Sequence, residues 1–247
     1  MLPRVIPCLL LRDRGLVKTV KFKSDVYVGD PVNAVRIFND KEVDELILLD
    51  IDATREGRGP DFDLIAEIAG ECFMPVAYGG GITSFADVQR VIRCGIEKVV
   101  VNSAAYASLD VIREASATYG AQAVVGGIDV RKPLIGGYKL YSRSGLDEQK
   151  VKLTAHVEAL VAAGAGEIFV NSIDRDGVMA GYDIDLIRQV CAVTNTPVIA
   201  SGGAGSVPHL VEAVEKGGAT AVAAGSMFVF HGRHKAVLIN YPKDAFQ

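Results

Sequence analysis

Two pairs of short loops rich in glycine and other small residues have the composition of anion-binding loops. Glycine lets the backbone approach a phosphate closely, and amides at the start of a following helix point towards it. The candidate phosphate-binding residues are Gly80, Gly81, Asn102 and Ser103 in the first pair, and Gly202, Gly203, Ala204, Gly225 and Ser226 in the second. Glycines that only form tight turns are the alternative. Two such pairs favour a ligand that carries phosphate at two places.

Aspartates at the ends of apolar segments are the candidates for proton transfer, because a carboxylate with a suitable pKa can act as an acid or base. Asp129 ends the run AVVGGID and is the first candidate. Asp176, in NSIDRDG, is the second. Asp50, Asp52 and Asp174 have similar positions, but for them we favour a structural role such as binding loop amides.

Short apolar runs that alternate with helical patterns must position these residues. We predict strands near 4–10, 46–51, 75–78, 98–102, 122–129, 167–171, 197–201 and 220–224. We predict helices near 31–41, 61–71, 84–94, 107–118, 151–164, 183–194 and 206–216. Asp30 before Pro31, and Ser84 before an apolar periodic run, are typical of helix starts. The alternation predicts a parallel sheet, either closed into a barrel or open and doubly wound.

An internal repeat favours the closed barrel. Placing Pro75 on Pro197 aligns the segments that follow without a gap, so that Gly80 and Gly81 fall on the glycines 122 positions later. A repeat of half the chain, with four strands in each copy, closes into eight strands without exposed edges. We therefore predict a single-domain (β/α)8 TIM barrel over residues 1–247, built from half-barrels at about 1–120 and 121–247.

Charged residues also begin four of the predicted strands, with alternating sign: Arg4, Glu45, Lys98 and Glu167. At the bottom of a barrel they could form a neutral ring, and their spacing alone favours a stabilising plug. His231 and His234 could share a helical face as metal ligands, but solvent exposure is favoured and no metal site is expected. The polar segment that contains Lys18 could be a mobile loop that closes on the ligand, or a solvated loop.

Composition excludes several classes of protein. The 247 residues carry a formal charge of −4 and an apolar fraction of 49%, which argues against nucleic-acid binding and allows a large core. The cysteines 8, 72, 94 and 191 are scattered in apolar segments, which favours buried free thiols over disulfides or zinc ligands. The short apolar start is broken by Pro7, so we expect no signal peptide. The uncharged window 189–211 is interrupted by polar residues, Pro197 and Gly202, so we expect no membrane span and a cytoplasmic protein.

Several long motifs resemble the HisF-type cyclase subunit of imidazole glycerol phosphate synthase over about residues 1–230. They include RVIPCL, YGGGI, KVVVNSAA, QAVVGGID, NSIDRDGVMAGYD and IASGGAG. The resemblance implies a two-half barrel without an organic cofactor. It also implies a glutaminase partner at the barrel bottom that supplies ammonia, and a substrate with a phosphate at each end. It further implies that the residues of the charged ring gate ammonia entry, and that Lys18 is a catalytic lysine on a mobile loop.

One departure from that family concerns the chemistry itself. The cyclase uses two aspartates, and the one at the end of the fifth strand corresponds to Asp129. The other position is occupied by Leu10, which cannot titrate, and Asp13 is expected to lie in a loop too far along to replace it. The final segment FVFHGRHKAVLINYPKDAF also lacks the pattern of the usual last helix.

These departures, together with ECFMPVAYGGGI, resemble a paralogous group implicated in surface-polysaccharide synthesis. Its members are implicated in converting an acetamido sugar to an acetamidino sugar with ammonia from a dedicated glutaminase. A separate substrate-activating protein is a further partner to expect. Three functions therefore remain open. The barrel is an ammonia-using subunit of this type, a histidine-pathway cyclase that tolerates Leu10, or a non-catalytic scaffold that conducts ammonia to a third protein.

Overall fold

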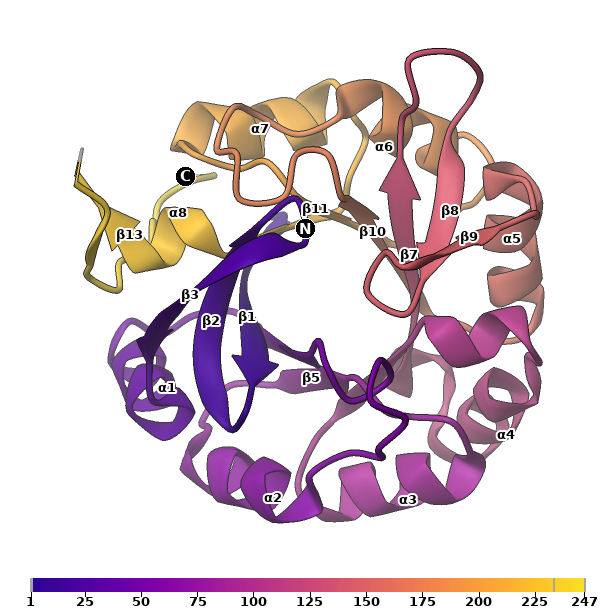
Figure 1. Cartoon of the computed structure of the whole chain (residues 1–247), viewed down its shortest axis with the longest axis horizontal. Helices are drawn as coiled ribbons and strands as arrows, with labels where there is room; N and C mark the ends of the chain where they lie inside the picture. The colour runs from indigo at the N-terminus through magenta and orange to yellow at the C-terminus, as the bar shows by residue number, and fades with distance from the viewer. Residues whose placement is uncertain (1, 233, 247) are drawn as a thin grey trace.

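The computed structural model describes residues 2–232 and 234–246, and eight of its parallel strands close into a ring (Figure 1). In order around the ring they are β1 (Arg4–Arg12), β4 (Leu46–Asp50), β5 (Val76–Gly79), β6 (Lys98–Val101), β7 (Val124–Arg131), β10 (Glu167–Ser172), β11 (Val198–Ser201) and β12 (Ala221–Ala224). Strand β12 pairs in parallel with β1, from Arg4 opposite Ala221 to Pro7 opposite Ala224. This pairing confirms the (β/α)8 TIM barrel and excludes the open sheet.

Seven helices cover the outside of the ring (Figure 1). They are α1 (Pro31–Asp40), α2 (Phe62–Glu71), α3 (Phe85–Arg93), α4 (Asp110–Tyr119), α5 (Leu153–Ala162), α6 (Ile184–Cys191) and α7 (Val207–Glu215). Both helix starts expected from the sequence are confirmed. The Asp30 side chain accepts a hydrogen bond from the backbone N–H of Asn33, and Ser84 forms a reciprocal capping box with Asp87.

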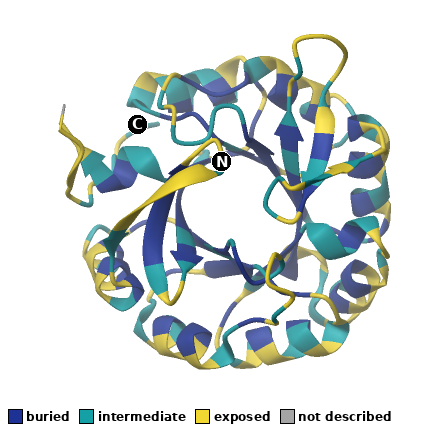
Figure 2. Ribbon diagram, in the orientation of Figure 1, coloured by how far each residue is buried: buried dark blue, intermediate teal, exposed yellow. Residues whose placement is uncertain are grey.

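The strands are buried on both faces, as parallel strands covered by helices are, and this gives the molecule two apolar layers (Figure 2). The outer layer packs the strands against the helices and contains Phe38, Ile68 and Ile112, all fully buried. The inner layer fills the barrel itself. It consists of Ile6, Cys8, Ile47, Ala77, Val100, Val125, Phe169, Ile199, Ala221 and Ala223. A continuous apolar interior therefore separates the two ends of the barrel.

The segment after the first strand is not the loop that we expected from its polar composition. It forms β2 (Gly15–Val20) and β3 (Lys23–Gly29), an antiparallel hairpin that pairs with the end of β1. The apolar residues Leu16 and Val17 are buried and hold the hairpin against the barrel, which the charges around them concealed in the sequence. A second hairpin, β8 (Lys139–Ser142) and β9 (Asp147–Gln149), extends β7 in the same way.

The remaining elements are short. They are the 3-10 helices η1 (Ser103–Tyr106) and η2 (Ala121–Ala123), the helix α8 (Ser226–Val229), and the two-stranded hairpin β13 (Phe230–His231) and β14 (Ala236–Val237). The last four-residue helix and its hairpin confirm that the usual final helix is replaced. His231 and His234 are exposed on this hairpin, so the hypothesis of a shared helical face is wrong.

Two other sequence expectations are met in part. All four cysteines are free thiols, but only Cys8 is fully buried and the other three are half-buried. Among the described residues, no helix is both long enough and apolar enough to cross a bilayer.

Candidate active site

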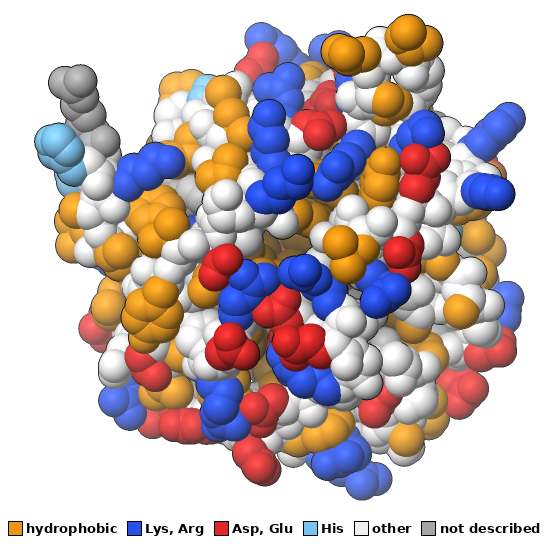
Figure 3. Space-filling view, viewed as in Figure 1, with side chains coloured by type: hydrophobic (Ala, Val, Ile, Leu, Met, Phe, Trp, Pro, Cys, Tyr) orange, Lys and Arg blue, Asp and Glu red, His pale blue; other side chains and the backbone are white. Residues whose placement is uncertain are grey.

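The carboxyl ends of the barrel strands surround one cavity, seen as a hollow ringed by charged side chains (Figure 3). Every candidate phosphate-binding residue lines it: Gly80, Gly81, Asn102, Ser103, Gly202, Gly203, Ala204, Gly225 and Ser226. The two loop pairs therefore share one site, as a ligand with two phosphates requires. Asp129, Asp176 and Lys18 line the same cavity.

The backbone at the paired glycines admits no side chain. Gly80 has φ +116°, and a Cβ there would lie 2.3 Å from the carbonyl oxygen of Asp50. Gly202, its counterpart in the sequence repeat, has φ +87°, and a Cβ there would lie 2.6 Å from the carbonyl oxygen of Ser172. Glycine is therefore needed at both positions to keep the backbone close to the strand ends, where its amides can reach an anion.

Asp129 is held by an amide on each side of its strand. The side-chain NH2 of Asn102 donates to one carboxylate oxygen at 2.8 Å, and that of Asn171 donates to the other at 3.3 Å. Burial raises the pKa of Asp129 to about 7, although the two hydrogen bonds oppose that shift. A carboxyl group with this pKa can both give and take a proton near neutral pH.

Sequence reasoning did not identify Asn171. The signal was present, because Asn171 is a polar residue within the last two positions of an otherwise apolar strand, in IFVNS. Asn102 was identified, but as a phosphate ligand, and its contact with Asp129 was not foreseen.

Asp176 faces the same cavity and anchors the β2–β3 hairpin. Its carboxylate accepts hydrogen bonds from the Thr19 hydroxyl at 2.7 Å and from the backbone N–H of Phe22 at 3.3 Å. Its backbone carbonyl accepts a further bond from the N–H of Lys21. Burial raises the pKa of Asp176, and the Thr19 hydrogen bond partly offsets that rise. The hairpin therefore lies over the cavity and is fastened to the loop after β10.

The three aspartates for which we favoured a structural role, Asp50, Asp52 and Asp174, each have a partner of that kind. Arg58 binds the Asp50 carboxylate through two nitrogens, at 2.7 and 3.0 Å. Arg12 binds Asp52 in the same manner, at 2.6 and 3.0 Å. The Asp174 carboxylate accepts a hydrogen bond from the backbone N–H of Lys132. Bidentate arginine pairs of this kind fix a carboxylate in place, which suits a scaffold.

Leu10 places an apolar side chain in the cavity wall, at the position where the sequence resemblance implies an aspartate. It lies in the cavity wall with Leu49, Val100 and Phe169, across the mouth from Asp129. Asp13 is exposed in the turn after β1 and does not line the cavity. Burial also raises the pKa of the Cys8 thiol to about 12, so Cys8 stays protonated.

Lys18 projects from the hairpin into the cavity and is only 4% exposed. Its Nζ donates to the backbone carbonyl of Cys8 at 2.6 Å, and burial lowers its pKa from the usual value. We expected this lysine to lie on a flexible loop that closes on the ligand. It belongs instead to a paired strand.

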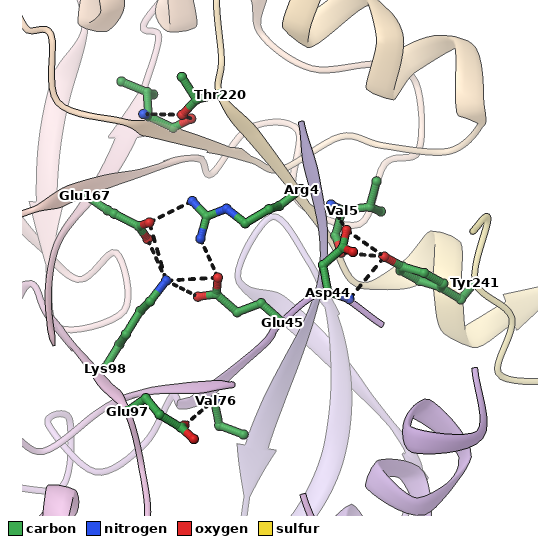
Figure 4. Close-up of polar contacts among 11 residues, drawn as sticks. Arg4, Val5, Asp44, Glu45, Val76, Glu97, Lys98, Glu167, Thr220 and Tyr241 are labelled. Atoms are coloured by element: carbon green, nitrogen blue, oxygen red, sulfur yellow. Dashed lines mark hydrogen bonds and ion pairs between the residues drawn. The ribbon is translucent and has the colours of Figure 1, made fainter. Parts of the chain in front are cut away.

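The four charged residues at the strand beginnings meet at the opposite end of the barrel (Figure 4). The Arg4 guanidinium contacts Glu45 at 2.5 Å and Glu167 at 2.7 Å. The Lys98 ammonium contacts the same two carboxylates at 2.8 and 3.3 Å. Two cations and two anions thus alternate around a closed, neutral ring below the apolar interior. Among the described residues, no group of three His, Cys, Asp or Glu side chains is arranged to bind a metal.

The raised pKa of Asp129 makes a testable prediction about stability. A carboxyl group with a pKa of about 7 in the folded state and about 4 in the unfolded state favours folding at low pH, and this contribution is lost as the pH rises towards 7. Between pH 5 and pH 8, wild type should therefore lose roughly 1–3 kcal/mol of unfolding free energy relative to Asp129→Asn. Urea unfolding at both pH values measures the difference.

The exposed carboxylate of Asp185 provides the matched control, since its side chain retains 66% exposure. The Asp185→Asn variant should follow the wild-type pH dependence. Parallel curves for wild type and Asp129→Asn would show that Asp129 titrates normally, and would remove this argument for proton transfer near neutral pH.

Comparison with known proteins agrees with this geometry. A family model described as histidine biosynthesis protein matches residues 4–235. A Pseudomonas aeruginosa protein provisionally named imidazole glycerol phosphate synthase subunit hisF2 is 56% identical over 239 residues, covering 97% of this chain and 95% of that protein. A Vibrio vulnificus protein provisionally named subunit hisF3 is 48% identical over 243 residues, covering 98% and 94%. Subunit HisF of this synthase from Streptococcus mutans is 40% identical over 225 residues, covering 91% and 90%. The chain therefore belongs to the histidine biosynthesis protein family, as a HisF-type barrel subunit.

Proposed function

We propose that this barrel receives ammonia from a glutaminase subunit and adds it to a phosphate-bearing substrate, converting an acetamido group of a nucleotide sugar to an acetamidino group. The product would serve lipopolysaccharide or O-antigen synthesis in the cytoplasm. The observation that carries the proposal is the combination of intact phosphate loops and a retained Asp129 with Leu10 in the cavity wall. Such a site can hold a substrate and move one proton, but it lacks a second free carboxylate at the first strand.

In this proposal, neutral ammonia would have to pass between the apolar side chains that fill the barrel. A glutaminase docked at the bottom would release ammonia at the ring formed by Arg4, Glu45, Lys98 and Glu167, which serves as the proposed gate. Beyond the ring the lining is apolar, from Ile6 and Ile47 to Val100 and Phe169. Transfer of a charged ammonium into such a lining is costly, whereas neutral ammonia enters at far smaller cost.

The chemistry at the mouth requires one nucleophile and one proton acceptor. Ammonia leaving the interior would attack the amide carbon of the substrate, and Asp129 would take a proton from the attacking nitrogen. Because the amide oxygen is a poor leaving group, the proposal includes a separate activating protein that first transfers a phosphoryl or nucleotidyl group from a nucleoside triphosphate to this oxygen. After ammonia adds to the carbon, the oxygen leaves with the transferred group. The two loop pairs would fix the phosphates, and Lys18 would close the site from the hairpin that Asp176 anchors. No metal or organic cofactor enters this scheme.

A cyclase of histidine synthesis is the second candidate, favoured by the HisF name and 40% identity of the Streptococcus mutans relative. The cyclase scheme implied by the family uses two carboxylates. In this chain the first of these positions is Leu10, and the neighbouring Asp50 is bound by Arg58.

An ammonia conduit without catalysis is the third candidate. The same ring and apolar interior would serve it, and the product would form on a third protein. This candidate and the leading proposal differ in one respect, namely whether the Asp129 carboxylate takes part in the chemistry.

The direct test of the leading proposal supplies an acetamido-bearing nucleotide sugar with the barrel, its glutaminase, glutamine, the activating protein and ATP. We expect a product in which NH replaces one oxygen, detected by mass spectrometry. Ammonium salt should replace glutamine and the glutaminase. Unchanged substrate in the complete mixture, together with turnover of the cyclase substrate, would refute the proposal.

The role of Leu10 is tested with the cyclase substrate and ammonium salt. Wild type should show no turnover at ordinary enzymatic rates, on the order of 1 per second. Leu10→Asp should gain measurable cyclase activity, because it restores a carboxylate opposite Asp129, and Leu49→Asp offers a control in the same wall. Turnover by wild type at an ordinary rate would instead identify a working cyclase.

A further inference from the structure

The C-terminal segment that replaces the usual last helix runs beside the charged ring at the bottom of the barrel. The hydroxyl of Tyr241, in this segment, reaches Val5 and Asp44 (Figure 4). These two residues are the sequence neighbours of Arg4 and Glu45, which are two of the four ring members. A side chain from the far end of the sequence therefore contacts the chain next to half of the ring.

The Tyr241 hydroxyl joins β1 to the residues just before β4 through several hydrogen bonds. Its oxygen lies 2.9 Å from the Val5 carbonyl oxygen and 3.1 Å from the Asp44 carboxylate, either of which can accept its proton. The hydroxyl also accepts a bond from the backbone N–H of Asp44 at 3.4 Å. The Asp44 carboxylate in turn accepts from the Val5 N–H at 3.0 Å. Burial raises the pKa of Tyr241, so the hydroxyl keeps its proton and remains a donor near neutral pH.

These bonds occupy a stretch where the backbone pairing of β1 with β4 is missing. That pairing begins only at Cys8 opposite Ile47, whereas the pairing of β1 with β12 begins at Arg4. Backbone groups alternate in direction along a strand, so Pro7 faces β4 as Val5 does, and Pro7 has no N–H to donate there. The lower end of the β1–β4 seam is therefore closed by a side-chain bridge instead of a backbone ladder.

Two other ring members are held by regular backbone pairing. Lys98 lies opposite Ala77 in the β5–β6 ladder, and Glu167 lies opposite Val125 in the β7–β10 ladder. Glu45 differs, because β4 begins only at the next residue. Its carboxylate contacts both cations of the ring. A shift of Glu45 would therefore break two of the four contacts that close the ring.

We propose that Tyr241 is a positioning residue of the proposed ammonia gate. Its hydroxyl closes the lower end of the β1–β4 seam and so holds Arg4 and Glu45 in contact. Without the hydroxyl, the Val5 carbonyl oxygen loses its donor, and water can enter the seam to satisfy it. Ammonia released below the ring then has a route out through the side of the barrel.

The inference rests on the proposed function for the passage of ammonia, but the bridge between the strands does not depend on the reaction. The bridge can therefore be tested in the barrel subunit alone, and the gate in the complete system.

Tyr241→Phe tests the bridge, because it removes the hydroxyl and keeps the aromatic ring against Phe228. The Val5 amide should exchange with deuterium about three- to tenfold faster than in wild type, as measured by NMR, since one hydrogen bond of the seam is lost. Lys98, whose side chain is 15% exposed, should react faster with an amine-labelling reagent by a similar factor, with the exposed Lys150 as internal reference.

Tyr119→Phe is the matched control. Tyr119 also packs against a phenylalanine, Phe85, with 6.3 Å between the ring centroids. Its hydroxyl makes no hydrogen bond to any described residue, so this variant should match wild type in both measurements. Asp44→Ala removes the carboxylate on the other side of the bridge and should reproduce both changes seen in Tyr241→Phe.

The complete system with the glutaminase measures the effect on the gate. With glutamine as the nitrogen source, Tyr241→Phe should form about three- to tenfold less product per glutamine hydrolysed, because ammonia escapes through the opened seam. With saturating ammonium salt it should form product at the wild-type rate, because the mouth of the barrel is unchanged.

Two results would overturn the inference. One is wild-type exchange of Val5 together with wild-type labelling of Lys98 in both Tyr241→Phe and Asp44→Ala. The other is an unchanged product yield per glutamine in Tyr241→Phe. If the seam opens as expected but wild type itself forms no acetamidino product, the bridge stands and the proposed reaction fails.

Discussion

Closure of the barrel by the pairing of β12 with β1 is the constraint from which both ends of the molecule follow. It brings Cys8 near the start of the chain within contact of Gly225, so that loops distant in sequence line one cavity. The same closure brings the first residues of four strands together at the other end, where their charges cancel in a ring. In an open sheet neither arrangement could form, because residues at opposite edges would not meet.

Because the barrel interior is apolar, a charged side chain at the mouth destabilises the fold unless it is paired. Pairing therefore distinguishes structural residues from those of the site. Asp50 and Asp52 are neutralised by arginines and hold the loop after β4 in place. Within the described part of the chain, the hydrogen bonds of the Asp129 side chain come only from amides, and that of Lys18 goes only to a carbonyl. Both side chains can therefore still interact with a ligand. With Leu10 on the facing wall, the cavity is equipped to bind two phosphates and to transfer a proton at one place.

The strands, the helices and the shared cavity were predictable because each rests on a local pattern: apolar runs, helix caps such as Asp30, and glycine pairs repeated at a fixed offset. The two hairpins were not predictable. In the first, the buried apolar residues Leu16 and Val17 stand among many charges, so no clear strand pattern appears. The partners of Asp129 were missed for a related reason. The contacts of Asn102 and Asn171 join neighbouring strands that lie far apart in the sequence, and no local pattern encodes them.

The central claim is that the barrel itself performs chemistry through Asp129, and Asp129→Asn in the reconstituted amidination reaction tests it most directly. Asparagine keeps the size and shape of the side chain but cannot accept a proton, and its NH2 group requires one of the two neighbouring amides to turn its oxygen towards it. We predict that the rate of acetamidino product formation falls by about 10²–10⁴-fold while glutamine hydrolysis by the partner continues. Product formed at the wild-type rate would contradict the account and would leave the barrel as a conduit for ammonia.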